Sequence, residues 1–203
     1  NIELELTDYR PSVPGRYLMT AVSLSRAKLF YVDTSGNSGV LKRLESRDRK
    51  IAFTELRPIE PGLYGYFSCV PSEVRCAPAN FNFIDYDGND VVARVVPDEN
   101  SDLNFHDVAR GPNGTYFFIF ANFDYKSASV DNRIQEWDEK GRKLFNWRMD
   151  DHLPELAAGR PKETIHINSI DLDRDGSIFV SVLQMSTIFK IAYPSGKVLA
   201  RIS

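Results

Sequence analysis

The pattern of hydrophobic and polar positions predicts short β-strands along most of the chain. Its clearest part is the C-terminal segment, where runs of β-branched and aromatic residues alternate with gaps rich in Gly, Pro, Asp and Ser. No long stretch repeats its apolar residues with the period of a helix. Four antiparallel strands in a segment of this size are typical of one β-propeller blade. The four predicted strands are residues 166–171, 178–182, 187–193 and 197–202.

The same pattern occurs four times in the chain. In each copy a turn glycine leads directly into an apolar run, as expected for the second strand of a blade; these glycines are Gly15, Gly62, Gly114 and Gly176. A second turn glycine closes the third strand of each copy and recurs every 52 to 55 residues, at Gly36, Gly88, Gly141 and Gly196. A repeat of this length indicates a radial β-architecture.

We therefore predict an all-β chain that forms part of a β-propeller. The prediction divides it into four four-stranded blades, at residues 1–47, 48–99, 100–150 and 163–203, with residues 150–162 as an inserted connection that carries one helical turn. An open arc of blades leaves an apolar face uncovered at each end. We expect further blades or a partner chain to close the ring.

Composition narrows the class of protein. Hydrophobic residues make up 42% of the chain and aromatic residues 12%, which indicates a globular domain. The net charge of −3 comes from mixed signs without a basic block, so neither nucleic acid nor an anionic membrane is an expected partner. No apolar run is long enough for a membrane-spanning helix. The chain does not begin with Met and its first residues do not form a signal peptide, so we expect upstream sequence to have been removed.

The only two cysteines, Cys69 and Cys76, flank a short loop that contains a proline. This arrangement favours a local disulfide, which would place the protein in an oxidising compartment, either periplasmic or extracellular. Two reduced thiols are the alternative. The spacing is not that of a CxxC pair and no other cysteine could complete a metal site, so neither a metal nor another cofactor is expected.

Two histidines occupy matching positions in the repeat. The first strand of every propeller blade lines the central channel, and His106 and His166 begin that strand in the third and fourth predicted blades. Two imidazoles on one channel wall could bind an anion or transfer a proton near neutral pH. Asp107 and Asn168 lie beside them and could orient the rings. The alternative is that these residues only satisfy backbone groups at strand ends.

Two other features have structural interpretations. The acidic segment 171–176 has the spacing of a calcium loop but lacks its final glutamate, and a plain hairpin turn is favoured. Trp137 and Trp147 fall on neighbouring predicted strands and are expected to pack inside a blade.

Several segments between residues 80 and 203 resemble the bacterial arylsulfotransferases of the PAPS-independent type. They are His106-Asp-Val-Ala-Arg-Gly-Pro-Asn-Gly-Thr-Tyr, Asn132-Arg-Ile-Gln-Glu-Trp-Asp, Leu144-Phe-Asn-Trp and His166-Ile-Asn-Ser-Ile-Asp. The resemblance implies a six-bladed, exported propeller that moves a sulfuryl group from one phenol to another through a sulfated histidine. It also implies that His106 and His166 hold the sulfuryl group and donate protons around it. Asn168 and Asp107 are then the candidate substrate-binding residues, for a small aryl sulfate or phenol.

Two features depart from the family pattern. The family places an arginine in the strand after His-x-Asn-Ser, where this chain reads Ser181-Val-Leu-Gln, so that Leu183 or a neighbour occupies the position. Leucine cannot offer a guanidinium group to an oxyanion. The family's nucleophilic histidine lies in a later blade, and activity would require the missing blades to supply it. The alternatives are a non-catalytic propeller that binds a protein or glycan, and a metal-dependent propeller hydrolase.

Overall fold

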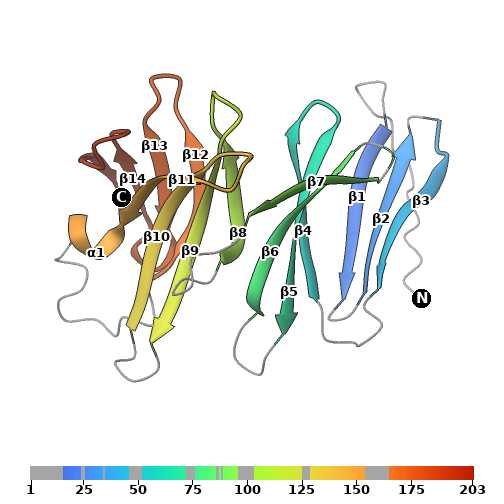
Figure 1. Ribbon diagram of the computed structural model, residues 1–203, viewed down its shortest axis with the longest axis horizontal. Helices are drawn as coiled ribbons and strands as arrows, with labels where there is room; N and C mark the ends of the chain where they lie inside the picture. Colours follow the sequence, from blue (N-terminus) through green and yellow to red (C-terminus); the bar gives the residue numbers. More distant parts are fainter. Residues whose placement is uncertain are drawn as a thin grey trace.

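The chain forms four antiparallel β-sheets that follow one another in an arc (Figure 1). The computed structural model describes residues 16–23, 26–33, 35–45, 52–71, 76–85, 87, 89–95, 103–124, 129–153 and 165–203. In every sheet the strands pair in chain order, so each sheet is a simple meander. We name the sheets blade 1 to blade 4 along the chain.

The strand bounds are as follows. Blade 1 contains β1 (Arg16–Ser23), β2 (Arg26–Asp33) and β3 (Ser38–Glu45). Blade 2 contains β4 (Ala52–Glu60), β5 (Leu63–Pro71), β6 (Cys76–Asp85) and β7 (Asp90–Val95). Blade 3 contains β8 (Leu103–Arg110), β9 (Tyr116–Asp124), β10 (Ser129–Trp137) and β11 (Lys143–Arg148). Blade 4 contains β12 (Ile167–Leu172), β13 (Ile178–Val182), β14 (Thr187–Ile191) and β15 (Val198–Ile202).

The predicted all-β propeller architecture is confirmed. Blades 2, 3 and 4 have four strands, and blade 1 has three in the described part of the chain, since residues 1–15 lie outside it. One helical turn, α1 (Met149–His152), follows β11, and a single 3₁₀ turn, η2 (Leu183–Met185), connects β13 to β14.

Apolar side chains fill the spaces between neighbouring blades. One cluster joins blade 2 to blade 3 and includes Phe67, Phe81, Phe83, Leu103, Phe118, Phe120 and Trp137. A second joins blade 3 to blade 4 and includes Phe117, Ile119, Ile134, Trp147, Ile167, Ile178, Val180 and Phe189. Successive side chains of a strand point to opposite faces, so the apolar run of β9 contributes to both clusters in turn. Both tryptophans are buried there, as the sequence predicts.

A polar contact also crosses between blades 3 and 4. Glu136 on β10 is only 4% exposed, and its carboxylate accepts hydrogen bonds from the hydroxyls of Thr115 and Tyr193, each at 2.6 Å. The bond to this carboxylate raises the pKa of Tyr193 to about 12. Because the folded-state pKa lies above the ordinary value of 10.0, this contribution to stability is complete below pH 10 and is lost as the pH rises towards 12.

Substitution of Glu136 by glutamine is expected to lower the free energy of unfolding by about 1–2 kcal/mol, because two charge-assisted hydrogen bonds become neutral ones. The pKa of Tyr193 should fall towards 10.0 in the same variant. Urea denaturation and a tyrosine titration followed by NMR measure the two effects. The exposed Glu139→Gln is the matched control, and equal stability of the two variants would contradict the expectation.

The turn glycine Gly196 has a positive φ of 73° and also lies against two aromatic rings. A Cβ atom there would be 2.9 Å from Cδ1 of Trp147 and 3.1 Å from Cε1 of His152. Gly141 has a similar φ of 72°, but a Cβ atom added to it would meet no other atom within 4 Å. Both alanine variants carry the cost of a left-handed backbone, and only Gly196→Ala adds a clash.

Gly196→Ala is therefore expected to destabilise the fold by about 1 kcal/mol more than Gly141→Ala. The difference in urea midpoint between the two variants, at a constant denaturant slope, measures it. A smaller loss for Gly196→Ala than for Gly141→Ala would show that the packing of Trp147 and His152 on this turn is not tight.

Candidate functional site

The candidate site lies where the first strands of three blades run side by side. β8 contacts both β4 and β12, so blade 3 supplies the middle strand of this group. Each of the three strands breaks register with the second strand of its own blade. Bulges of this kind turn side chains out of the regular alternation and are common beside active sites.

The bulge in β8 contains His106 and Asp107. Leu103 pairs with Phe120 and Val108 with Phe118, so the four residues between Leu103 and Val108 face a single position of β9. The side chain of Asn104 accepts a hydrogen bond from the backbone N–H of His106 at 2.9 Å, which closes a local turn inside the bulge. An asparagine two residues before the histidine was a sequence signal for this turn.

His166 directly precedes β12, and Asn132 on β10 holds the backbone on either side of it. The Asn132 amide donates to the carbonyl oxygen of Ile165 at 2.7 Å and accepts from the backbone N–H of Ile167 at 3.4 Å. Asn132 is almost completely buried, so this clamp between blades 3 and 4 is shielded from water. It fixes the position from which the His166 ring projects.

The structure brings the two predicted histidine rings together. The ring centroids of His106 and His166 are 5.1 Å apart and the ring planes make an angle of 21°, so the rings are stacked. Burial lowers the pKa of His166, and the neighbouring His106 lowers it further, while Asn168 acts in the opposite direction. Two stacked imidazoles resist carrying two positive charges at once. An anion between or beside them would relieve that repulsion.

The Nε2 atom of His166 is buried and has no hydrogen-bond partner among the described residues. A buried polar atom without a partner costs about 1–3 kcal/mol, and in native proteins such atoms are rare. An orphan ring nitrogen beside a second imidazole is therefore the strongest indication in the structure that a ligand oxygen binds here.

Gln184 in η2 contacts His166 twice. Its side-chain oxygen accepts from the backbone N–H of His166 at 3.1 Å, and its side-chain nitrogen lies 3.0 Å from Nδ1 of the ring. Gln184 and Leu183 are both exposed, Leu183 by 59%, and no contact of Leu183 with His166 is seen in the described part of the chain. Of the two residues at the position where the family pattern has an arginine, Gln184 is the one that reaches the histidine. The short 3₁₀ turn that brings Gln184, rather than Leu183, to His166 was not predicted.

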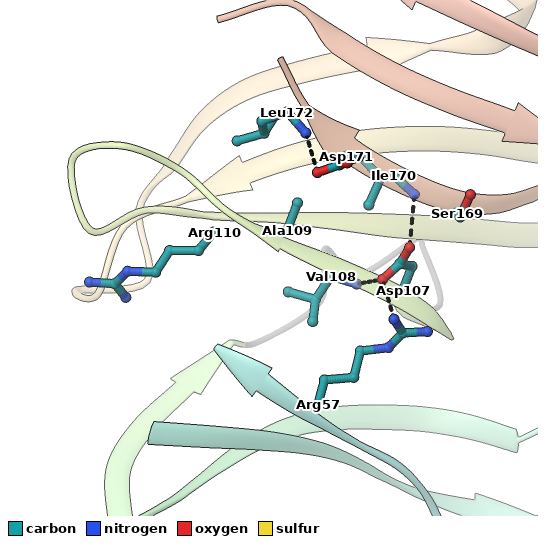
Figure 2. Close-up of a pocket in the computed structure, with 9 residues that line it drawn as sticks. All are labelled: Arg57, Asp107, Val108, Ala109, Arg110, Ser169, Ile170, Asp171 and Leu172. Atoms are coloured by element: carbon teal, nitrogen blue, oxygen red, sulfur yellow. Dashed lines mark hydrogen bonds and ion pairs between the residues drawn. The ribbon is translucent and has the colours of Figure 1, made fainter. Parts of the chain in front are cut away.

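Asp107 connects three blades through its carboxylate (Figure 2). Oδ1 lies 2.9 Å from the Arg57 guanidinium of β4 and accepts from the backbone N–H of Val108, and Oδ2 accepts from the backbone N–H of Ile170 in β12 at 3.0 Å. Arg57 also donates to the carbonyl oxygen of His106 at 2.7 Å. The partners of Asp107 are all groups of the protein itself, which indicates a positioning role. Its predicted role in substrate binding stays a prediction.

A cavity of about 540 Å³ lies beside this network (Figure 2). Its walls come from the same three strands, β4, β8 and β12, and its polar surface includes Arg57, Asp107, Arg110, Ser169 and Asp171. The volume suits a small organic molecule. The side chains of opposite charge on its walls can orient a polar ligand rather than only attract an anion.

Two further predictions from the sequence concern the disulfide and the acidic turn. Cys69 and Cys76 lie on the paired strands β5 and β6, but their side chains are outside the described residues, so the disulfide stays a prediction. In the acidic turn, the ammonium group of Lys190 lies 2.6 Å from a carboxylate oxygen of Asp173 and 2.9 Å from one of Asp175. The turn thus carries its own cation, consistent with the favoured hairpin interpretation.

Two kinds of feature do not occur among the described residues. No three His, Cys, Asp or Glu side chains in the described part of the chain are grouped as a metal site requires. No helix within the described ranges has the length and apolar character needed to cross a membrane.

A family comparison adds to this geometry. The profile of the arylsulfotransferase (ASST) family matches residues 13–202. The chain belongs to the arylsulfotransferase family. The match begins well before residue 80, where the resemblance in sequence motifs starts, and so extends over parts of all four blades. The matched range therefore contains the position of Arg57 in blade 2 as well as those of the histidines in blades 3 and 4. A comparison with curated proteins finds no match.

Solved structures show the same propeller fold at low sequence identity. A Bacteroides caccae protein of unknown function has a TM-score of 0.58 at 12% identity, over 94% of this chain and 58% of that one. A luciferin-regenerating enzyme gives 0.59 at 11% identity, over 95% and 60%. The α-L-arabinanase of Penicillium chrysogenum, solved with arabinobiose, gives 0.58 at 13% identity, over 91% and 58%. The present chain thus spans about 58–60% of the length of these proteins, and the likeness concerns the fold alone.

Proposed function

We propose that this arylsulfotransferase-family propeller takes part in sulfuryl transfer between phenolic compounds, with His106 and His166 as the catalytic residues that contact the sulfuryl group and its leaving oxygen. The observation that carries the proposal is the stacked histidine pair with a buried, unpartnered Nε2 on His166. Sulfuryl transfer requires donors aimed at the sulfuryl oxygens and an acid for the departing phenolate. Imidazole can serve in either role near neutral pH.

The reaction has two half-steps. In the first, the bond between sulfur and the phenolic oxygen of the donor breaks, its electron pair leaves with the phenolate, and the phenolate receives a proton held by the His106–His166 pair. The sulfuryl group is bonded meanwhile to a nucleophile, which the family resemblance identifies as a histidine of a further blade. In the second, the acceptor phenol gives its proton back to the pair and takes the sulfuryl group from that histidine, whose bond to sulfur breaks. His106 and His166 stabilise the group in both half-steps, and Asn168 binds it beside them.

The test uses the intact protein with 4-nitrophenyl sulfate as the donor and phenol as the acceptor. We expect release of 4-nitrophenol to depend on added phenol and to be matched by formation of phenyl sulfate. Release without phenyl sulfate would indicate hydrolysis instead of transfer. Export to the periplasm or the cell exterior, the remaining part of the proposal, is tested by fractionation of cells that express the intact gene.

A second function is favoured by one observation. The position at which the family has an arginine carries Leu183 and Gln184, so the guanidinium group expected there is replaced by neutral side chains. A propeller without that charge is a candidate for non-catalytic binding of a protein or glycan. Absence of any turnover by the intact protein would favour this alternative.

A further inference from the structure

The two contacts between Gln184 and His166 show which atom of the Gln184 side-chain amide is the oxygen and which is the nitrogen. A backbone N–H can only donate, so the atom 3.1 Å from the His166 nitrogen must be the amide oxygen. The other end, 3.0 Å from Nδ1 of the ring, is then the amide nitrogen, which can only donate. The assignment follows from the hydrogen-bond pattern alone and does not depend on the chemistry of a ligand.

An amide donor that faces Nδ1 requires Nδ1 to be the acceptor. A neutral imidazole carries one proton, on one of its two nitrogens, so the proton of neutral His166 must be on Nε2. Nε2 is the buried atom that has no partner among the described residues. A buried donor therefore lies beside the His106 ring without an acceptor at hydrogen-bond distance among the described residues, although Asn168 interacts with the same imidazole.

We propose that Gln184 is a positioning residue that fixes neutral His166 in the tautomer with the proton on Nε2, so that this N–H is presented to an oxyanion of the ligand. The inference rests on the proposed function for the identity of that oxyanion, which is a sulfuryl oxygen or the departing phenolate oxygen. It assigns His166 the role of a hydrogen-bond donor, because the ring's one available lone pair, on Nδ1, already accepts from Gln184.

This arrangement explains in physical terms how the site can work without the family's arginine, whose position carries Leu183 and Gln184 in this chain. An arginine would supply positive charge to the oxyanion directly. Gln184 supplies no charge and acts through the ring of His166. The described ionisable group that faces this ring is His106 on β8, and together with burial it lowers the pKa of His166. The ring is thus kept neutral, which is the form that Gln184 orients.

The test is the tautomer of His166 in the ¹⁵N-labelled intact protein, read from long-range ¹H–¹⁵N spectra of the imidazole rings across a pH titration. His106, His152 and His166 are the only histidines of the described chain, and single substitutions assign their signals. We compare the unsubstituted protein with Gln184→Glu and Gln184→Met. Leu183→Ala, in the same 3₁₀ turn and highly exposed, is the matched control.

In the unsubstituted protein we expect protonated Nε2 and unprotonated Nδ1. In Gln184→Glu the carboxylate can only accept a hydrogen bond, which favours a proton on Nδ1, so the tautomer reverses and the pKa of His166 rises. In Gln184→Met the donor to Nδ1 is lost, which shifts the same pKa upwards, while Leu183→Ala leaves both unchanged. A proton on Nδ1 in the unsubstituted protein, or an unaltered tautomer in Gln184→Glu, would overturn the inference. The spectra report the tautomer without turnover, so a negative sulfotransferase assay leaves this test valid.

Discussion

Replacement of either His106 or His166 by alanine is expected to lower kcat/KM for an aryl sulfate by about 10²–10⁴-fold, the usual range for loss of a general acid or base. His166 offers a buried, unpartnered Nε2, and the His106 ring is stacked on it at 5.1 Å. Because the rings touch, the two losses should not be additive, and the double variant is expected to be little worse than the more damaging single one. Initial rates with 4-nitrophenyl sulfate measure all three variants.

His152 is the control for these histidine variants. It is exposed and its ring stacks on Trp147 at 5.3 Å, whereas the rings of His106 and His166 stack on each other. His152→Ala should therefore keep the activity of the unsubstituted protein. If the unsubstituted protein turns over its substrate and the His106 and His166 variants do so equally well, the catalytic assignment is wrong.

Replacement of Asp107 by alanine is expected to lower the free energy of unfolding by about 2–4 kcal/mol. Asp107 is only 7% exposed, and its carboxylate receives the Arg57 guanidinium of blade 2 and the Ile170 N–H of blade 4. Without it, the backbone N–H groups of Val108 and Ile170 lose this acceptor, and the Arg57 guanidinium loses one of its partners. Such a loss costs more than the net value of either bond, because the remaining groups stay partly dehydrated.

The Asp107 variant has a matched control and a second readout. Asp171 lines the same cavity but is exposed, and its carboxylate accepts only from the adjacent Leu172 N–H among the bonds seen in the described chain, so Asp171→Ala should cost well under half as much. Urea denaturation measures both. Because Arg57 also holds the His106 carbonyl, Asp107→Ala should in addition shift the imidazole signals of His106. Equal stability of the two alanine variants would show that the contact between blades contributes little.

The repeat in the sequence was enough to predict the architecture and the approach of the two histidines. Turn glycines such as Gly114 and Gly176 mark the start of a blade's second strand, and counting back from them places His106 and His166 at equivalent positions. Stacking of two chain-distant rings then follows from the radial symmetry of blades. The repeat involves residues along the whole chain, so it can be recognised in a single sequence.

The contacts that hold the histidines could not be predicted in the same way. Arg57 and His106 are 49 residues apart, and Asp107 and Ile170 are 63 residues apart. Nothing local in either segment indicates the partner, since an arginine on a strand is ordinarily a solvent-facing residue. The bulge in β8 is what turns Asp107 towards both neighbours, and the sequence offers only Asn104 as a sign of it.

The contact between Gln184 and His166 could not be predicted for a different reason. The prediction ended the second strand of blade 4 at Val182 and left residues 183–186 as a gap between strands, so it could name only Leu183 or a neighbour as the residue at the site. The chain instead enters a 3₁₀ turn at Leu183, which changes the side on which each residue lies. A turn of three residues has no hydrophobic period of its own, so only the folded chain shows which side chain meets His166.

The division of the apolar interior into two clusters has a mechanical consequence. Blade 3 is the only described blade that belongs to both, because β9 sends alternate side chains into each. A change in the tilt of blade 2 can therefore reach the interior of blade 4 through blade 3, both by the alternating side chains of β9 and by the Asp107 carboxylate that bonds Arg57 and Ile170.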